Sequence, residues 1–328
     1  MLSVVPHIPV LLEQVLDALE PIAGKTIIDG TFGAGGYSLA MLKRGVNIIA
    51  IDKDPNVAPF AEKVGAEYGE QFTFISGSFS DLDELVESEV DAIVLDIGVS
   101  SMQLDEGERG FSFMRDGPLD MRMSSVGQSA ADIINSYGER ELADLLFAYG
   151  EEKKARRISK AIIEARKTAP ILRTLQLADL IEKTIGRKKG ANHPATRSFQ
   201  ALRIAVNEEF EQLVLALFAA EEKLTLGGVL AVVTFHSLED RIVKRFFASG
   251  KASSSGSRHL PAQAERQARW IDIAKPKKAN SDEVEKNPRS RSATLRFALR
   301  TEIPARMVSF QNLGVPLSNK QSSKRLGA

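Results

Sequence analysis

Short apolar runs alternate with amphipathic segments along the first third of the chain. Short apolar runs bounded by turn residues predict buried strands, whereas apolar residues that recur every three or four positions predict helices. After an opening helix over residues 10–20, we predict strands at 25–29, 46–52, 72–76 and 90–96 and helices at 36–45, 55–68 and 80–86. Strict alternation of this kind implies parallel strands joined by right-handed crossovers, and therefore an α/β fold.

The alternation stops after Ile97, and a long segment without strand signals follows. Residues 98–127 are rich in Gly, Ser, Met and Arg without a clear period. A loop of this length inside a compact protein usually has a function. The next segment carries helical patterns at residues 130–137, 139–149, 152–167 and 174–186. We therefore predict a mostly helical insert.

Strand patterns return in the last third of the chain. Residues 197–225 are predicted to form one long amphipathic helix that ends at Gly227-Gly228. The segments predicted after it are strand 229–235, helix 237–247, a mobile loop at 249–268, and closing strands 270–274 and 292–300. The chain thus divides into a discontinuous α/β domain (1–105 and 197–300), a loop plus helical insert (106–196) and a tail (301–328) that we expect to be disordered.

Composition narrows the classes of protein that this chain can belong to. A hydrophobic content of 43% with 26% charged residues is typical of a globular protein, and 328 residues suffice for a large core. The N-terminal segment has no basic start, and Pro6 and Pro9 interrupt its apolar stretch. We therefore expect neither a signal peptide nor a membrane span, and we expect the protein to be cytoplasmic. The sequence has no cysteine, which excludes disulfides, thiolate metal sites and a cysteine nucleophile. The four histidines are far apart in sequence, so we expect no metal site.

The charges are balanced overall but unevenly distributed. Lys and Arg number 43, as do Asp and Glu, yet residues 153–203 hold fourteen basic and only three acidic side chains. Such segregation predicts a surface that meets a polyanion. The alternative is a set of solvated helix faces with no partner.

A glycine-rich turn follows the first predicted strand. It spans Asp29–Gly36, and Asp52 lies nineteen positions beyond Gly33 at the end of the second strand. Glycines let the backbone approach a ligand closely, and an acid at the second strand can bind ribose hydroxyls. Ser38 occupies the place of the third glycine of a dinucleotide motif, so the pattern favours S-adenosylmethionine instead. The alternative is a tight turn without a ligand.

Other candidate residues also follow predicted strands, because ligands of open parallel sheets bind beyond the carboxyl ends of the strands. Phe79 is a candidate to cover an adenine, or else a core aromatic residue. Asp96 is a candidate to bind the methionine end of the cofactor or the amine to be methylated, or else caps the loop through Gly98. His236 lies at the same edge, but Ser237 reaching over Asp240 fits a helix N-cap without catalysis.

Longer stretches of the chain carry a more specific resemblance. They are Asp29–Gly33, Leu95–Ser101, Arg109–Phe113, Met114–Met123, His193–Arg197 and Phe235–Arg241. On these residues the chain closely resembles the bacterial ribosomal RNA small subunit methyltransferase H family, from about His7 to Arg300. The resemblance implies a Rossmann-like, class I methyltransferase sheet with an inserted, mostly helical substrate domain. It also implies methylation of the N4 amine of a decoding-centre cytosine in 16S rRNA, with S-adenosylhomocysteine as the second product.

The resemblance carries residue roles onto this chain. The implied cofactor contacts are Gly35, Gly36, Tyr37, Asp52, Phe79, Asp96 and Gln103. The family often has His where this chain has Tyr37, and we expect that contact to be made by the backbone. Phe111 and Phe113 are implied to stack on an unpaired base, with core packing as the alternative. The side chains implied to bind phosphates are Arg109, Arg115, Arg122, Arg197 and Arg203.

The catalytic group is less well defined by the sequence. Many amine methylases of bases carry an (Asp/Asn/Ser)-Pro-Pro-(Tyr/Phe) turn after the fourth strand, where this chain has Asp96-Ile97-Gly98-Val99. We expect Asp96 or a nearby backbone carbonyl to bind the amine, with His236 as a second catalytic candidate. The expected partner is 16S rRNA or the small ribosomal subunit. We expect no membrane and no metal ion, and the sequence does not decide whether the protein forms a homodimer. Alternatives are another DNA or RNA amino-methyltransferase, a small-molecule methylase and a non-catalytic RNA adaptor.

Overall fold

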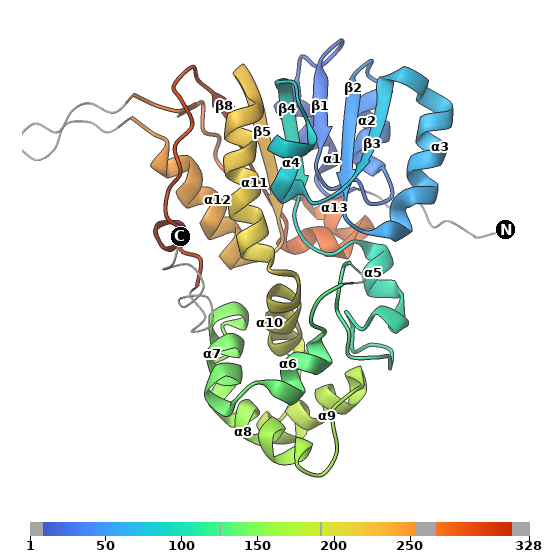
Figure 1. The fold of residues 1–328 in the computed structure, drawn as a ribbon, viewed down its shortest axis with the longest axis vertical. Helices are drawn as coiled ribbons and strands as arrows, with labels where there is room; N and C mark the ends of the chain where they lie inside the picture. The colour runs from blue at the N-terminus through green and yellow to red at the C-terminus, as the bar shows by residue number, and fades with distance from the viewer. Residues whose placement is uncertain (1–8, 125, 191, 253–266, 317–328) are drawn as a thin grey trace, which may run out of the picture. The chain divides into compact units, whose positions relative to one another are not determined.

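The computed structural model describes residues 9–124, 126–190, 192–252 and 267–316. They divide into two units (Figure 1). The sheet unit comprises the described residues of Met1–Gly98 and Phe210–Val315, and the helical unit comprises those of Val99–Glu209 with Pro316.

The sheet unit contains one sheet of eight strands in the order β3-β2-β1-β4-β5-β8-β6, with β7 paired to β8. The strands are β1 Thr26–Asp29, β2 Asn47–Asp52, β3 Phe72–Ser76, β4 Val90–Asp96, β5 Leu224–Thr234, β6 Trp270–Ile271, β7 Lys277–Lys278 and β8 Thr294–Arg300. Strands β1 to β5 are parallel, and β8 runs antiparallel to β5. The strand order reverses between β1 and β4, which is where ligands of such folds bind.

Helices and short 3₁₀ turns connect these strands. The helices of this unit are α1 Leu12–Leu19, α2 Gly36–Leu42, α3 Ala58–Tyr68, α4 Leu82–Leu85, α11 Glu209–Lys223, α12 Ser237–Ser249, α13 Ser281–Lys286 and α14 Phe310–Leu313. The 3₁₀ turns are η1 Pro55–Val57, η2 Gly69–Gln71, η3 Phe79–Asp81 and η5 Pro288–Ser292. The central strands are continuously apolar because both faces are covered, and Ile28 of β1 and Ile93 of β4 are fully buried.

The helical unit contains α5 Ser101–Asp105, α6 Ala130–Ser136, α7 Glu139–Gly150, α8 Ala155–Arg166, α9 Thr174–Ile185 and α10 Thr196–Asn207, with η4 Gly107–Arg109 (Figure 1). Helix α10 packs on α7. The two backbones approach so closely that a Cβ atom on Gly150 would collide with the carbonyl oxygen of Arg197. A glycine is therefore required at this crossing.

The predicted helix over residues 197–225 is wrong as a single element. It is two helices, α10 and α11, and Glu208 between them adopts a left-handed conformation with φ 50°. The side chain of Asn207 donates hydrogen bonds to Met121 O (2.8 Å) and Arg203 O (2.9 Å), which fixes the end of α10. The unit boundaries consequently fall at Gly98 and Glu209, whereas the sequence predicted 105 and 197.

Two predicted boundaries at the glycine pair and the tail also need correction. Gly227-Gly228 lies inside β5, which begins at Leu224, and the pairing of β4 with β5 is irregular there. Residues 301–316 are not a disordered tail, because α14 places Leu313 and Val315 in the core. Residues 317–328 lie outside the described residues, as do residues 253–266 of the predicted loop.

Helix α13 was not predicted from the sequence. It is short and almost entirely polar, so it shows no helical repeat of apolar residues.

Among the helices that the structure describes, none has both the length and the apolar composition needed to cross a membrane.

Candidate active site

The carboxyl ends of the parallel strands bring the predicted cofactor residues of the sheet unit together. Asp29 pairs in register with Val94 of β4, and Asp52 pairs with Ser76 of β3. Hydrogen bonds also link the loops after these strands, from Gly30 N to Val94 O (2.9 Å) and from Gly77 N to Asp52 O (3.0 Å). The sequence thus predicted correctly which segments meet at this edge.

The glycine turn has a backbone conformation that other residues rarely adopt. Gly33 and Gly35 have φ values of 55° and 80°, in the left-handed region. A Cβ atom on Gly30 would lie 2.6 Å from the side chain of Leu95, so this turn also packs tightly on β4. The turn is therefore fixed by backbone geometry and leads directly into α2.

Asp29 is a buried part of this turn. Its carboxylate accepts hydrogen bonds from Ser38 Oγ (2.7 Å) and Thr31 N (3.3 Å). Burial raises the pKa of Asp29 from its ordinary value of 3.8 to about 6, against these hydrogen bonds. Asp29 therefore ties the turn, through Thr31 N, to α2, through Ser38.

Asp52 links the second strand to the glycine turn. Its Oδ2 accepts the N–H of Gly33 (2.8 Å), and its Oδ1 accepts the N–H of Asp54 (2.9 Å). Burial raises the pKa of this carboxyl group above its ordinary value. Each carboxylate oxygen can accept two hydrogen bonds, so Asp52 can also accept from both hydroxyls of a ribose.

Asp96 ends β4 and carries an atom that lacks a partner. Its backbone N–H donates to Thr31 Oγ1 (2.8 Å), which ties β4 to the glycine turn. Its carboxyl oxygen Oδ1 is buried and has no hydrogen-bond partner among the described residues. Burial, followed by the charges of Asp29 and Glu239, raises the pKa of Asp96 well above its ordinary value. A buried oxygen atom without a hydrogen bond destabilises the folded protein unless a ligand donates a hydrogen bond to it.

Tyr37 and Phe79 lie beside the glycine turn. The hydroxyl of Tyr37 donates a hydrogen bond to Val10 O, so its buried side chain points to the N-terminal segment. The tyrosine hydroxyl is therefore used within the protein, and contact of the Tyr37 backbone with the cofactor stays a prediction. Phe79 opens η3, and its Cβ lies 3.3 Å from where a Cβ on Gly30 would be.

His236 is the N-cap of α12, which the sequence assigned to Ser237. Nδ1 of His236 accepts the N–H of Glu239 (3.4 Å), and Glu239 Oε2 accepts the N–H of His236 (3.2 Å) and of Phe235 (2.8 Å). These reciprocal bonds form a capping box one residue earlier than predicted. They explain His236 without catalysis, and its role in chemistry stays a prediction.

Glu239 is the residue of this site that sequence reasoning missed. Its carboxylate is fully buried, and Oε1 lies 2.9 Å from Nε2 of His236. Its negative charge contributes to the raised pKa of Asp96. His236 and Glu239 are three residues apart, which is the spacing of a capping box. This spacing is the sequence signal that could have identified Glu239.

The remaining predicted cofactor contact, Gln103, belongs to the helical unit. Its Oε1 accepts the N–H of Ser100 (3.0 Å), and its side chain is buried. The two candidate stacking residues also belong to this unit and pack inside it. Phe111 is 5% exposed under the guanidinium of Arg109, and Phe113 lies between His193 (4.6 Å) and Phe199 (4.9 Å). The burial of Phe111 favours the packing interpretation.

The five candidate arginines divide into two groups. Arg109 donates to Met123 O (3.0 Å), Arg122 pairs with Asp120 (2.6 Å), and Arg203 pairs with Glu209 (2.8 Å). These guanidinium groups shape the helical unit. The side chains of Arg115 and Arg197 are exposed, each with one hydrogen bond to a backbone carbonyl. Arg115 and Arg197 are thus the two best placed to meet a phosphate.

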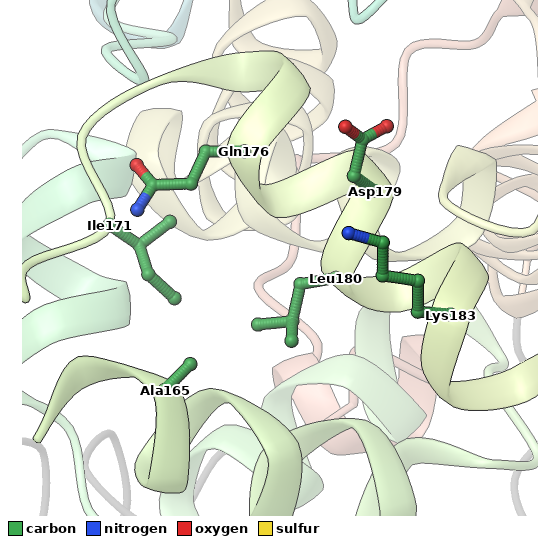
Figure 2. A pocket seen from close by; sticks show the side chains of 6 residues that line it. All are labelled: Ala165, Ile171, Gln176, Asp179, Leu180 and Lys183. Atoms are coloured by element: carbon green, nitrogen blue, oxygen red, sulfur yellow. The ribbon is translucent and has the colours of Figure 1, made fainter. Parts of the chain in front are cut away.

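Most of the fourteen basic side chains of residues 153–203 are exposed. The exposed ones are Lys153, Lys154, Arg156, Arg157, Lys160, Lys167, Arg173, Lys183, Arg187, Lys188, Lys189 and Arg197. A hollow of about 290 Å³ lies between α8 and α9 in this region. Figure 2 shows its lining side chains, Ala165, Ile171, Gln176, Asp179, Leu180 and Lys183. No residue predicted for the site lines this hollow.

The arrangement of the sheet defines the class of the protein. Five parallel strands in the order 3-2-1-4-5 are followed by β8, antiparallel between β5 and β6. Together with the glycine turn after β1 and the acid after β2, this is the architecture of a class I methyltransferase that uses S-adenosylmethionine.

Comparison with known proteins identifies the family. Residues 4–301 match the model of the MraW methylase family, and the chain belongs to this family. It is 51% identical over 97% of both chains to ribosomal RNA small subunit methyltransferase H of Cereibacter sphaeroides strain ATCC 17029. The proteins of the same name from Mesorhizobium japonicum and Chelativorans sp. strain BNC1 are 53% and 51% identical, over 95% of this chain and 92% of theirs.

Proposed function

We propose that this protein transfers a methyl group from S-adenosylmethionine to the N4 amine of a decoding-centre cytosine in 16S rRNA, in the cytoplasm. The observation that carries the proposal is Asp96, whose buried Oδ1 has no hydrogen-bond partner within the described part of the chain and lies at the carboxyl edge of the parallel strands. The relatives, at about half identity over nearly the whole chain, are named for the RNA of the small ribosomal subunit.

The residues at the sheet edge fit this cofactor. The cofactor supplies a methyl group on a positively charged sulfur, which reacts readily with an amine. The backbone of Gly35 to Tyr37 would contact the cofactor at the start of α2. Asp52 would accept hydrogen bonds from its ribose hydroxyls, and Phe79 would cover its adenine. The buried Oδ1 of Asp96 suits a ligand with a positive charge or an N–H group.

Asp96 is proposed to act on the acceptor amine. The lone pair of the N4 amine is delocalised into the cytosine ring, so a hydrogen bond from N4–H to a carboxylate favours the pyramidal form that reacts. The pKa of Asp96 is raised in the protein alone, and a cation beside the carboxyl group lowers it again. The resulting carboxylate can accept the proton that N4 must lose. Correct alignment of the reactants supplies about 7–11 kcal/mol of the barrier reduction.

The helical unit is proposed to bind the RNA. Its exposed basic side chains, with Arg115 and Arg197, provide sequence-independent contacts to phosphates. Phe113, which is half-buried, stays the better of the two candidates for stacking on an unpaired base. The roles of Gln103, Arg109, Phe111, Arg122 and Arg203 in ligand binding stay predictions.

The proposal is tested with small ribosomal subunits that lack the modification. The protein and isotopically labelled S-adenosylmethionine are incubated with these subunits, with free 16S rRNA, or with duplex DNA or small amines as competing acceptors. The methylated product is mapped by mass spectrometry. We expect N4-methylcytidine at one decoding-centre position. Label on duplex DNA or on a small molecule, or cofactor binding without any product, would support one of the alternatives instead.

A further inference from the structure

We propose that Glu283 is a positioning residue for the cofactor: it fixes the segment Pro9–Leu11 against the first turn of α2. This inference rests on the proposed cofactor site. No contact of Glu283 with the cofactor is required, because the effect passes through the N-terminal segment to the glycine turn.

The first observation is the close packing of this segment on α2. A Cβ atom on Gly36 would collide with the ring of Pro9, so the proline lies directly on the glycine that opens the helix. The next residue, Val10, accepts a hydrogen bond from the hydroxyl of Tyr37 through its carbonyl oxygen. On the side of α2, these contacts are made by Gly36 and Tyr37, the two residues whose backbone is expected to line the cofactor. Movement of the segment would therefore disturb this part of the site.

The second observation is the conformation of Leu11. Its φ of 54° lies in the left-handed region, which leucine rarely adopts, and its side chain is completely buried. Such a conformation persists only where the surroundings determine it. Leu11 is also the N-cap residue of α1, and its own side chain cannot cap the helix. Something else must therefore fix the start of α1.

Glu283 provides that contact from the far end of the sequence. Its Oε1 accepts the N–H of Leu11 (2.6 Å), and its Oε2 accepts from Nε2 of Gln14 in the first turn of α1 (3.3 Å). A carboxylate at a helix N-terminus is favoured by the helix dipole. Glu283 is itself fixed, because its N–H donates to Oδ1 of Asn280, the N-cap of α13.

These contacts form one connected chain of groups from α13 to the glycine turn. Glu283 binds Leu11, the adjacent Val10 binds Tyr37, and Pro9 covers Gly36. Burial, with smaller contributions from Asp96, Asp29 and Glu283, raises the pKa of Tyr37 well above its ordinary value. The tyrosine therefore keeps its proton and remains a hydrogen-bond donor under physiological conditions.

Glu283→Ala tests this connection by two main measurements, cofactor affinity and hydrogen exchange, and turnover kinetics add a third. Removing a charged acceptor from a buried N–H should weaken the calorimetric affinity for S-adenosylmethionine by about tenfold. Hydrogen exchange of residues 10–16 in the cofactor-free protein should become faster, while exchange of β4 stays unchanged. In turnover, the KM for the cofactor should rise, whereas kcat at saturating cofactor and the KM for RNA should not change. Glu283→Gln, which keeps an uncharged acceptor, should recover part of the affinity.

Glu285→Ala is the matched control, because this exposed glutamate belongs to the same helix and the same substitution should leave affinity and exchange unchanged. Equal affinity of Glu283→Ala and wild type would overturn the inference, as would a loss of affinity without faster exchange at residues 10–16. If Glu283→Ala does not fold, Glu283→Gln decides by the same two measurements. A wild-type protein that does not bind the cofactor would instead refute the proposed function.

Discussion

Asp52 and Gly33 are joined by a hydrogen bond of 2.8 Å between the Oδ2 atom of the carboxylate and the backbone N–H. The bond connects the tip of the second strand to the middle of the glycine turn after the first. One side chain therefore shapes the turn, and the same side chain is the one that we propose for the ribose hydroxyls.

Asp52→Ala should weaken binding of S-adenosylmethionine, because it removes an acceptor for the ribose hydroxyls and frees the N–H of Gly33. Hydrogen bonds to charged groups contribute about 1.5–3 kcal/mol, which corresponds to about 10- to 150-fold in affinity. Isothermal calorimetry measures the effect, with Glu84→Ala, an exposed substitution on α4, as the control. Affinity equal to that of the wild type would show that Asp52 does not contact the cofactor.

Asp96→Ala should abolish turnover and leave the fold intact. Asp96→Asn should also be inactive, since an amide cannot accept the proton from the amine. The asparagine variant should be more stable than the wild type by about 1 kcal/mol at pH 8, because it replaces a carboxyl group whose charge is disfavoured by burial. Single-turnover assays and urea denaturation measure the two effects. A retained rate above about a tenth of wild type contradicts a direct role, because proton transfer alone contributes more.

Binding of S-adenosylmethionine should strengthen as the pH rises, and binding of S-adenosylhomocysteine should change less. The pKa of Asp96 is raised, so its carboxyl group holds a proton at low pH and becomes an anion only as the pH increases. The anion attracts the sulfonium of the substrate, whereas the product has no charge on its sulfur. Calorimetry in buffers of different ionisation enthalpy should detect proton release with the substrate. The two pH profiles should become parallel in Asp96→Asn, and profiles already parallel in the wild type would refute this coupling.

Asp29 should make the free energy of unfolding fall as the pH rises from about 4 to about 6. The pKa of Asp29 is about 6 in the folded protein against an ordinary 3.8, so the folded state binds the proton more tightly than the unfolded chain. Its stabilising contribution is therefore complete below about pH 4 and lost above about pH 6, by about 3 kcal/mol. Urea denaturation at several pH values, with Asp29→Asn as the reference, isolates this contribution. A difference between wild type and variant that is constant across the range would contradict it.

Reversing charges on α8 should weaken RNA binding without affecting the cofactor. The double substitution Arg156→Glu and Lys160→Glu changes two exposed side chains of this helix. We expect affinity for the small subunit to fall, and the slope of log affinity against log salt to become shallower by about 0.7–0.9 for each phosphate that the variant no longer neutralises. Filter binding over a range of salt concentrations measures the slope. Lys63→Glu on α3 is the control, and an equal effect there would indicate a general charge effect.

The sequence alone determined the central parallel strands of the sheet and the edge at which the candidate cofactor residues meet. Apolar runs such as Ile48–Ile51 are largely buried, and their length and turn boundaries are visible without any tertiary contact. Since parallel strands end at one edge, the positions of Asp29, Asp52 and Asp96 after three strands already implied that they lie together. The glycine turn was equally visible in the sequence, because its left-handed residues, Gly33 and Gly35, are of the residue type that adopts this conformation without steric cost.

Only the tertiary structure decided how individual side chains are used. The apolar stripe of residues 197–225 continues across Glu208, so its period could not reveal a break made by one left-handed residue. Whether an arginine pairs with an acid, as Arg203 does with Glu209, depends on which groups the fold brings near it. The contact of Glu283 with Leu11 joins residues 272 positions apart. That Asp96 Oδ1 finds no hydrogen-bond partner among the residues the structure describes depends likewise on every group packed around it. Local patterns carry no record of such distant neighbours, and folding alone creates them.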